Sequence, residues 1–182
     1  WEIFKRWRAM RNLKAFAPPP AMAAQIERAP ILLVAVDLSP EMEPLSQAIY
    51  LQVKRMLVNR PDARVACVNV IKSARIGIDQ TTDAAGNNLH VMRLVALKAW
   101  AEGIELNDDR LTYTVLENSD PATAIIDHAE ANRADHILMG ARGHSSARRF
   151  LGSVSAKVVA EAGCSVTVIR LPETASEPEG GS

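Results

Sequence analysis

Two glycine-containing stretches, at 140–143 and 152–155, carry the clearest chemical signal in this chain. Gly140 and Gly143 follow an apolar run at 136–139, and Gly152 opens a run with helical spacing. Glycines after a strand let main-chain N–H groups approach a ligand closely, because no Cβ intervenes. The first N–H groups and the positive dipole end of a helix favour an anion. The pattern therefore indicates a site for a phosphate-bearing ligand, although the same glycines would also suit a plain strand-to-helix turn.

Charged residues near these stretches agree with an anionic ligand. Residues 140–157 contain no acidic side chain and four basic ones, Arg142, Arg148, Arg149 and Lys157. Asp37 closes a separate apolar run at 31–36. In open α/β sheets, ligands bind beyond the carboxyl ends of the strands, where the strand order reverses. A carboxylate there can accept hydrogen bonds from an adenine amino group or a ribose hydroxyl, or it can simply cap the next helix. Together the acidic and glycine-rich motifs would suit the two ends of one nucleotide.

Other phosphate-binding and catalytic motifs are missing from the sequence. It contains no G-x-x-x-x-G-K-[ST] loop, no G-x-G-x-x-G fingerprint and no G-x-S-x-G elbow. Its histidines lack the spacing of metal ligands: His90, His128, His136 and His144. No nucleophile lies beside an evident base, so we expect no catalytic residue, and no metal beyond Mg²⁺ accompanying a nucleotide. A receiver domain is disfavoured, because Asp37 stands alone at its strand end and Arg170 occupies the place of the required lysine.

The elements that must position these residues follow from alternating apolar runs and helical patterns. Continuous apolar runs are typical of parallel strands covered on both faces. Ser39 and Asp120 each precede a proline, which indicates a helix start. The predicted strands are 31–36, 64–71, 111–116, 137–139 and 166–169; the predicted helices follow Pro40 and Pro121 and span 89–104 and 153–162, the last ending near Gly163. We therefore predict an α/β domain with an open, five-stranded parallel sheet and helices on both faces, a Rossmann-like arrangement.

Composition and charge limit the class of protein. The 182 residues include 21 basic and 21 acidic side chains, so no overall charge favours nucleic acid. No apolar run approaches the roughly 20 residues of a membrane span, and no secretory signal pattern is present. Cys67 and Cys164 lie in strand-like apolar runs, and we expect them to be reduced core residues rather than a disulfide. A cytoplasmic protein is the expectation that follows.

The two ends of the chain differ from its middle. Residues 1–29 are basic and contain three consecutive prolines, which predicts a linker helix behind an upstream domain or, alternatively, an amphipathic helix on a membrane or partner. Because the sequence starts at Trp1 rather than methionine, we expect it to be part of a longer protein. Residues 173–182 are acidic and rich in Gly and Ser, and we expect them to be disordered. The predicted domain occupies residues 30–172.

Residues 30–171 resemble a universal stress protein domain. The resemblance rests on the run ending at Asp37, on segments 120–122 and 136–144, and on segments 151–159 and 164–168. It implies the strand order 3-2-1-4-5, which places strands one and four side by side, and a homodimer formed through the last strand. It also implies an ATP-binding branch of the family, marked by a Gly-x-x-Gly…Gly-Ser/Thr signature.

Carried over position by position, the resemblance implies a nucleotide site. Asp37 would lie at the adenine-ribose end, the main chain of Val70 would face the adenine, and Gly140 would face the ribose and phosphates. The implied binding residues are Asp37, Val70, Gly140, Arg142, Gly143, Gly152, Ser153, Val154 and Ser155. The implied ligand is ATP, or alternatively AMP or ADP, with Mg²⁺ accompanying the nucleotide.

Three functions remain open from the sequence. The first is a nucleotide-binding sensor and dimerisation module. The second is a nucleotide-free dimerisation module, favoured because residues 144–151 form a loop one residue shorter than in the family signature, which would alter the phosphate geometry. The third is a slow ATPase or autophosphorylating protein, with Arg142 or His144 near the γ-phosphate. Segments 45–57, 74–80 and 147–151 also resemble stress-protein domains fused behind bacterial serine/threonine kinase domains, so an upstream kinase domain is expected in the parent protein.

Overall fold

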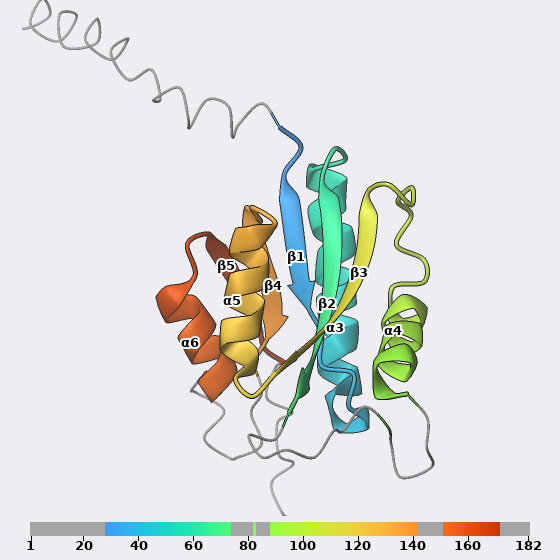
Figure 1. The fold of residues 1–182 in the computed structure, drawn as a ribbon. Coiled ribbons are helices and arrows are strands. Elements are labelled where there is room, and N and C mark those ends of the chain that lie inside the picture. Colours follow the sequence, from blue (N-terminus) through green and yellow to red (C-terminus); the bar gives the residue numbers. More distant parts are fainter. Residues whose placement is uncertain (1–27, 74–81, 83–87, 142–150, 172–182) are drawn as a thin grey trace, which may run out of the picture.

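Strands and helices alternate in the part of the chain that the computed structural model describes, residues 28–73, 82, 88–141 and 151–171 (Figure 1). The strands are β1 (Ile31–Ala35), β2 (Arg64–Lys72), β3 (Leu111–Asn118), β4 (His136–Gly140) and β5 (Ser165–Ile169). The helices are the 3₁₀ turn η2 (Pro40–Met42), α3 (Glu43–Asn59), α4 (Leu89–Trp100), α5 (Pro121–Ala131) and α6 (Ser153–Glu161).

The strands form one parallel sheet in the order β3-β2-β1-β4-β5. β1 lies in the centre, with Leu33 opposite Ala66 of β2 on one side and opposite Ile137 of β4 on the other. The chain moves outward from β1 to β3 and then returns to the other side of β1, so the strand order reverses between β1 and β4. The predicted fold class and strand order are therefore confirmed.

Two apolar cores lie on the two faces of the sheet. Helices α3 and α4 cover one face, and α5 and α6 cover the other (Figure 1). Successive strand side chains point to opposite faces, so Val34 enters the core under α3 and α4 while Leu33 enters the core under α5 and α6. Leu33, Val34, Ile137 and Leu138 are all 0% exposed. Burial on both faces explains why the central strands are continuous apolar runs in the sequence.

The two predicted cap-plus-proline signals have different outcomes. Asp120 caps α5 as predicted, accepting hydrogen bonds from main-chain N–H groups of the first turn at 3.1 and 3.5 Å. After Ser39, the chain first makes the turn η2 before α3 begins, and the Ser39 side chain caps neither element. Its hydroxyl donates instead to the carboxylate of Asp37, which precedes it.

Two helices end earlier than predicted. α4 ends at Trp100 rather than at 104, because Gly103 has a φ of 85°, a left-handed conformation that stops a helix. α6 ends at Glu161, and Ala162 after it is extended, with φ −66° and ψ 135°. Gly163 therefore does not act as a left-handed C-terminal cap; among the glycines that the structure describes, Gly103 is the one with positive φ.

The two cysteines are free thiols, as predicted. Cys67 is buried in β2, and Cys164 is partly buried just before β5. None of the described helices is long and apolar enough to cross a membrane.

Candidate functional site

The carboxyl ends of β1, β2 and β4 and the N-terminus of α6 meet at one edge of the sheet, which we call the carboxyl edge (Figure 1). The structure brings together at this edge the predicted residues Asp37, Val70, Gly140 and 152–155. Arg142 and Gly143, the other two predicted binding residues, lie outside the described residues, and so does His144.

Asp37 follows β1 and organises the turn into η2. Its Oδ1 atom accepts a hydrogen bond from the Ser39 N–H at 3.1 Å and another from the Ser39 hydroxyl at 2.7 Å. This turn-shaping role differs from the helix cap that the sequence left open for Asp37, because both bonds come from Ser39, the residue before η2. It fixes a partly buried carboxylate at the carboxyl edge. Because an ionised carboxylate can accept about four hydrogen bonds, this role is compatible with a further contact to a ribose or an adenine.

β2 extends beyond β1 at the carboxyl edge. The pairing of β2 with β1 ends at Val68, whereas its pairing with β3 continues to Lys72. Along a strand, alternate residues direct their N–H and C=O groups to the same side. The Arg64 N–H donates at 2.9 Å to the Pro30 carbonyl, just before β1. Val70 lies an even number of residues after Arg64, so its main-chain groups also point toward β1. At Val70, however, the β1–β2 ladder has already ended.

Asn69 lies beside this point and has an unusual environment. Its side chain is 4% exposed, and its Nδ2 donates to the Val36 carbonyl at 2.8 Å. Its Oδ1 is, in the described part of the chain, a buried side-chain oxygen without a hydrogen-bond partner. Leaving a buried acceptor unpaired costs about 1–3 kcal/mol. Sequence reasoning missed Asn69, although a polar residue near the end of the apolar run 64–71 was a visible signal.

The N-terminus of α6 has main-chain N–H groups without a side-chain cap. Its cap residue is Gly152, which has no side chain to accept from the first turn. Ser153 is exposed, whereas Val154 packs against the core under α5 and α6. Ser155 is only 2% exposed, and its hydroxyl donates to the Gly152 carbonyl at 3.1 Å. Any contact of Ser155 with a phosphate would therefore come from its main-chain N–H.

Gly140 ends β4, and the packing of α3 explains why it lacks a side chain. A Cβ at this position would lie 2.5 Å from Cδ2 and 2.8 Å from Cγ of Leu45. Leu45 is itself part of the core, with 8% exposure, so its side chain has little room to move. Core packing is sufficient reason for a glycine here, and the close approach of a ligand to Gly140 stays a prediction.

Lys157, one of the four basic residues near the glycines, is engaged by α5. Its Nζ lies 2.7 Å from Asp120 Oδ2 and 2.9 Å from the Thr123 hydroxyl. Hydrogen bonds from Lys157 and Thr123 lower the pKa of Asp120 to about 2, and the hydrogen bond to Asp120 raises the pKa of Lys157. In this arrangement Lys157 links α6 to α5 and is not a free phosphate ligand.

The carboxyl edge thus brings together three groups of the kind predicted for a nucleotide: a fixed carboxylate, the part of β2 that extends past the end of β1 in the described chain, and a helix N-terminus. Metal ligands are a different matter. Within the described ranges, no three His, Cys, Asp or Glu side chains gather where they could hold a metal ion. A Mg²⁺ ion at this edge would depend mainly on phosphate oxygens and water, which is the usual way proteins hold it beside a nucleotide.

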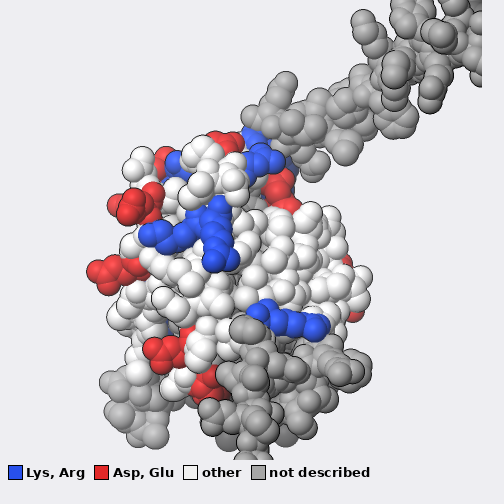
Figure 2. Space-filling view, turned by 180° about the vertical axis from the view of Figure 1, so that it is seen from behind, with Lys and Arg blue, Asp and Glu red and all other residues white. Residues whose placement is uncertain are grey.

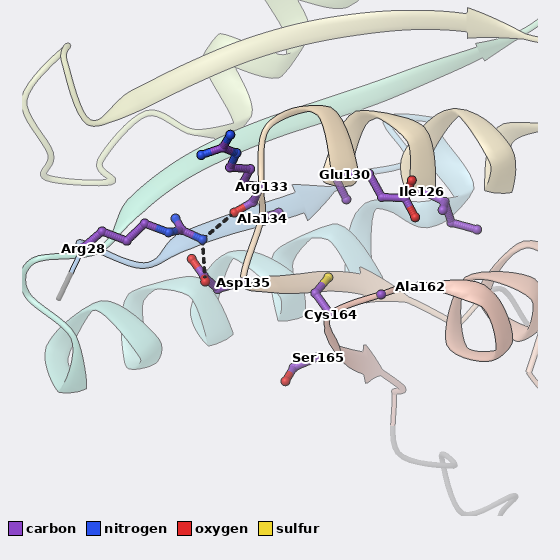
Figure 3. Close-up of a pocket in the computed structure, with 11 residues that line it drawn as sticks. Arg28, Ile126, Glu130, Arg133, Ala134, Asp135, Ala162, Cys164 and Ser165 are labelled. Atoms are coloured by element: carbon purple, nitrogen blue, oxygen red, sulfur yellow. Dashed lines mark hydrogen bonds and ion pairs between the residues drawn. The ribbon is translucent and has the colours of Figure 1, made fainter. Parts of the chain in front are cut away.

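Two pockets lie at the opposite edge of the sheet, around the amino ends of the strands. The larger, of about 640 Å³, lies near the C-terminal ends of α5 and α6 (Figure 3). There Arg28 donates to Asp135 Oδ1 at 2.7 Å and to the Arg133 carbonyl at 2.8 Å (Figure 3), and Asp135 Oδ2 accepts the Ile31 N–H at 2.8 Å. These contacts anchor the chain where it enters β1. Because ligands of open α/β sheets bind at the carboxyl ends of strands, we assign this hollow a structural role.

Comparison with known proteins identifies relatives in sequence and in fold. The model of the universal stress protein family matches residues 30–170. One curated relative, "Universal stress protein in QAH/OAS sulfhydrylase 3′ region" from Thermus aquaticus, is 42% identical over 76 residues, which cover 41% of this chain and 56% of the relative. The chain therefore matches little more than half the length of that relative.

Two solved structures share the fold. The first is a universal stress protein in complex with cAMP, at 17% identity and a TM-score of 0.55, covering 79% of this chain and 98% of that one. The second is a universal stress protein family protein from Arabidopsis thaliana with AMP bound, at 20% identity and a TM-score of 0.53, covering 77% and 90%.

Proposed function

Since this chain belongs to the universal stress protein family, we propose that it binds an adenine nucleotide at the carboxyl edge and acts as a regulatory module. One observation carries the proposal: β1 and β4 are neighbours at the point where the strand order reverses. Such a switch point is where open α/β sheets bind ligands. Here it places the carboxylate of Asp37 and the N-terminus of α6 on the same edge.

Each described residue at this edge has a proposed role. Asp37 accepts hydrogen bonds at the adenine-ribose end, and the main chain of Val70 faces the base. The N–H groups of 153–155 hold phosphate oxygens, with Gly152 and Gly140 close to the sugar-phosphate chain. Arg142 and Gly143 complete the proposed set.

The comparisons support an adenine base in particular. The two solved structures described above contain cAMP and AMP, and both ligands share the adenosine and differ in the phosphate. For this chain we propose ATP with Mg²⁺, because the N-terminus of α6, whose cap residue Gly152 has no side chain, suits an extended phosphate chain. AMP and ADP are the competing ligands in the test.

A regulatory role requires only that the nucleotide binds two conformations of the domain with different affinities. A nucleotide that binds one conformation of the domain more tightly than another shifts the population toward that conformation. We propose that nucleotide occupancy in this way alters the association of the domain 30–172 with its partners. The proposed partners are a second copy of the chain and an upstream kinase domain, with residues 1–29 as the linker, in a cytoplasmic protein.

The outer edge of β5 supports a homodimer. β5 is the last strand of the described sheet, paired on one side with β4. The Ser165 N–H donates to the Asp135 carbonyl on the β4 side, so Val166 and Val168 direct their N–H groups away from β4, to a side that is unpaired among the described residues. Figure 2 shows that the flank toward β5 carries few charged side chains. An open, weakly charged strand edge is suited to pairing with another copy.

A second candidate function is a dimerisation module that binds no nucleotide. Two observations favour it: packing against Leu45 accounts for Gly140, and the ion pair with Asp120 accounts for Lys157. Under this alternative, the carboxyl edge shapes a protein contact and the protein releases no nucleotide when denatured.

Calorimetry with two matched variants separates these functions. Ser153 is the first helical residue of α6, where proline is tolerated, and Gly152 before it is extended, as a residue before proline must be. Ser153→Pro therefore removes one N–H donor with little strain, while Ser153→Ala removes only the hydroxyl. We expect ATP and Mg²⁺ to bind the unmodified protein, Ser153→Pro to weaken binding about tenfold, and Ser153→Ala to change it little. If neither ATP, ADP nor AMP gives a heat signal, and fresh protein carries no nucleotide, the nucleotide proposal is abandoned.

A further inference from the structure

Asn69 has properties that core packing alone does not explain. It lies in the long strand β2, it is 4% exposed, and its Oδ1 has no hydrogen-bond partner among the residues that the structure describes. Its buried neighbours on the strand, Cys67 and Val68, are apolar and lie in the two cores. An apolar side chain at 69 would avoid the unpaired oxygen. The amide must therefore supply something that an apolar side chain cannot.

What the amide supplies is a hydrogen bond to the end of β1. The Val36 N–H donates to the Val68 carbonyl at 2.9 Å, which is the last rung of the β1–β2 ladder. In a parallel ladder the next rung would run from the Val70 N–H to the Val36 carbonyl. The Asn69 Nδ2 donates to that carbonyl at 2.8 Å instead. The side chain therefore occupies the acceptor that would have extended the ladder to Val70.

We infer that Asn69 is a positioning residue that ends the β1–β2 ladder one rung early and keeps the main-chain edge of Val70 open for the nucleobase. An N–H donor beside a C=O acceptor is complementary to the adenine edge, which pairs a ring nitrogen acceptor with an amino donor. Asn69 acts through Val36 and Val70 and does not itself have to touch the ligand. This inference rests on the proposed function for the identity of the ligand, but the effect of Asn69 on the ladder does not depend on any ligand.

The test replaces Asn69 with valine, which is apolar, close in volume and favoured in strands. In Asn69→Val the Val36 carbonyl is released and the unpaired oxygen is removed. We expect the protein to be at least as stable toward denaturant as the unmodified one. We expect the Val70 amide to exchange with solvent at least tenfold more slowly, because it gains the missing rung. Adenine nucleotide affinity should fall about tenfold, because roughly one hydrogen bond to the ligand is lost.

The matched control is Cys67→Val. Cys67 lies two residues before Asn69 on the same face of β2, and it is paired with Val34 rather than bonded to Val36 at the end of β1. This variant should leave both Val70 exchange and nucleotide affinity unchanged. Unchanged Val70 exchange in Asn69→Val would overturn the inference. So would a marked loss of stability together with weaker binding, because that pattern belongs to a purely structural residue.

The two proposals fail in different ways. If the unmodified protein binds no nucleotide but Val70 exchange still slows in Asn69→Val, the proposed function is wrong and the role of Asn69 in ending the ladder is upheld. If the nucleotide binds and Asn69→Val binds it equally well, the proposed function survives and the inference is overturned.

Discussion

At the scale of single residues, core packing alone accounts for the glycine at position 140. A methyl group at this position would overlap the side chain of Leu45. We predict that Gly140→Ala lowers the free energy of unfolding by about 1–3 kcal/mol, the usual cost of overpacking a core. The measurement is denaturant unfolding.

Gly163→Ala is the control for this prediction. A Cβ at Gly163 would meet no atom within 4 Å, and the residue has no positive φ. That variant should be neutral or slightly more stable, because alanine restricts the unfolded chain. Equal stability of the two variants would contradict the packing explanation. It follows that nucleotide binding is better tested at Ser153 or Asn69 than at Gly140.

The two thiols should differ sharply in reactivity. Burial raises the pKa of Cys67 to about 12, and Cys67 is 0% exposed, whereas Cys164 is only partly buried. Burial also raises the pKa of Cys164. Since the thiolate is the reactive form, we predict that a thiol reagent at pH 8 labels Cys164 well before Cys67 in the folded protein. Peptide mass spectrometry measures the order, and equal labelling rates would contradict the burial of β2.

At the scale of elements, the pair formed by Asp120 and Lys157 connects the start of α5 to α6. The pKa of Asp120 is lowered from 3.8 to about 2 in the folded protein. A lowered pKa means that the folded state favours the carboxylate, so this stabilisation is complete above about pH 4 and is lost as the pH falls toward 2.

Asp120→Asn tests this link, because asparagine keeps a capping oxygen but has no charge. We predict that the variant is less stable than the unmodified protein at pH 7 and that the difference shrinks steadily below pH 4. Denaturant unfolding over a series of pH values measures it. A difference that stays constant down to pH 2 would show that the ion pair contributes nothing.

The bounds of the strands and helices show what sequence patterns can and cannot predict. The strands were predicted within two residues at each end, because burial on both faces makes them continuous apolar runs. Helix ends were less accurate. α4 stops at Trp100, and Gly103 beyond it has a positive φ. A Cβ at Gly103 would lie 2.8 Å from the Tyr50 hydroxyl, a neighbour from a distant part of the chain that no local pattern reveals. Asn69 was missed because its role depends on a carbonyl 33 positions earlier in the chain.

At the scale of the whole molecule, the strand order could not be derived from local patterns. Pairing of β1 with β4 joins segments about a hundred residues apart, and only the resemblance to a family implied it. The engagement of Lys157 by Asp120 is equally non-local. The sequence therefore predicted which residues lie at strand ends, and the fold was needed to show which of them share one edge.

The outer edge of β5 gives a prediction for the assembly. We predict that the chain is a dimer in solution and that Val168→Pro makes it monomeric. The Val168 N–H points away from β4, so proline there removes an edge donor without removing a rung to β4. Light scattering after size exclusion gives the mass, and circular dichroism shows whether the variant is folded. An unmodified protein that is monomeric at all concentrations would contradict the prediction.

Mapping amide chemical shifts while ATP and Mg²⁺ are added to labelled protein shows whether an adenine nucleotide binds at the carboxyl edge. We expect the largest shifts at Val70 and at residues 153–155, which are far apart in sequence and share only this edge. Shifts that instead centre on the pocket around Arg28 and Cys164 at the amino ends of the strands, or no shifts at all, would contradict it.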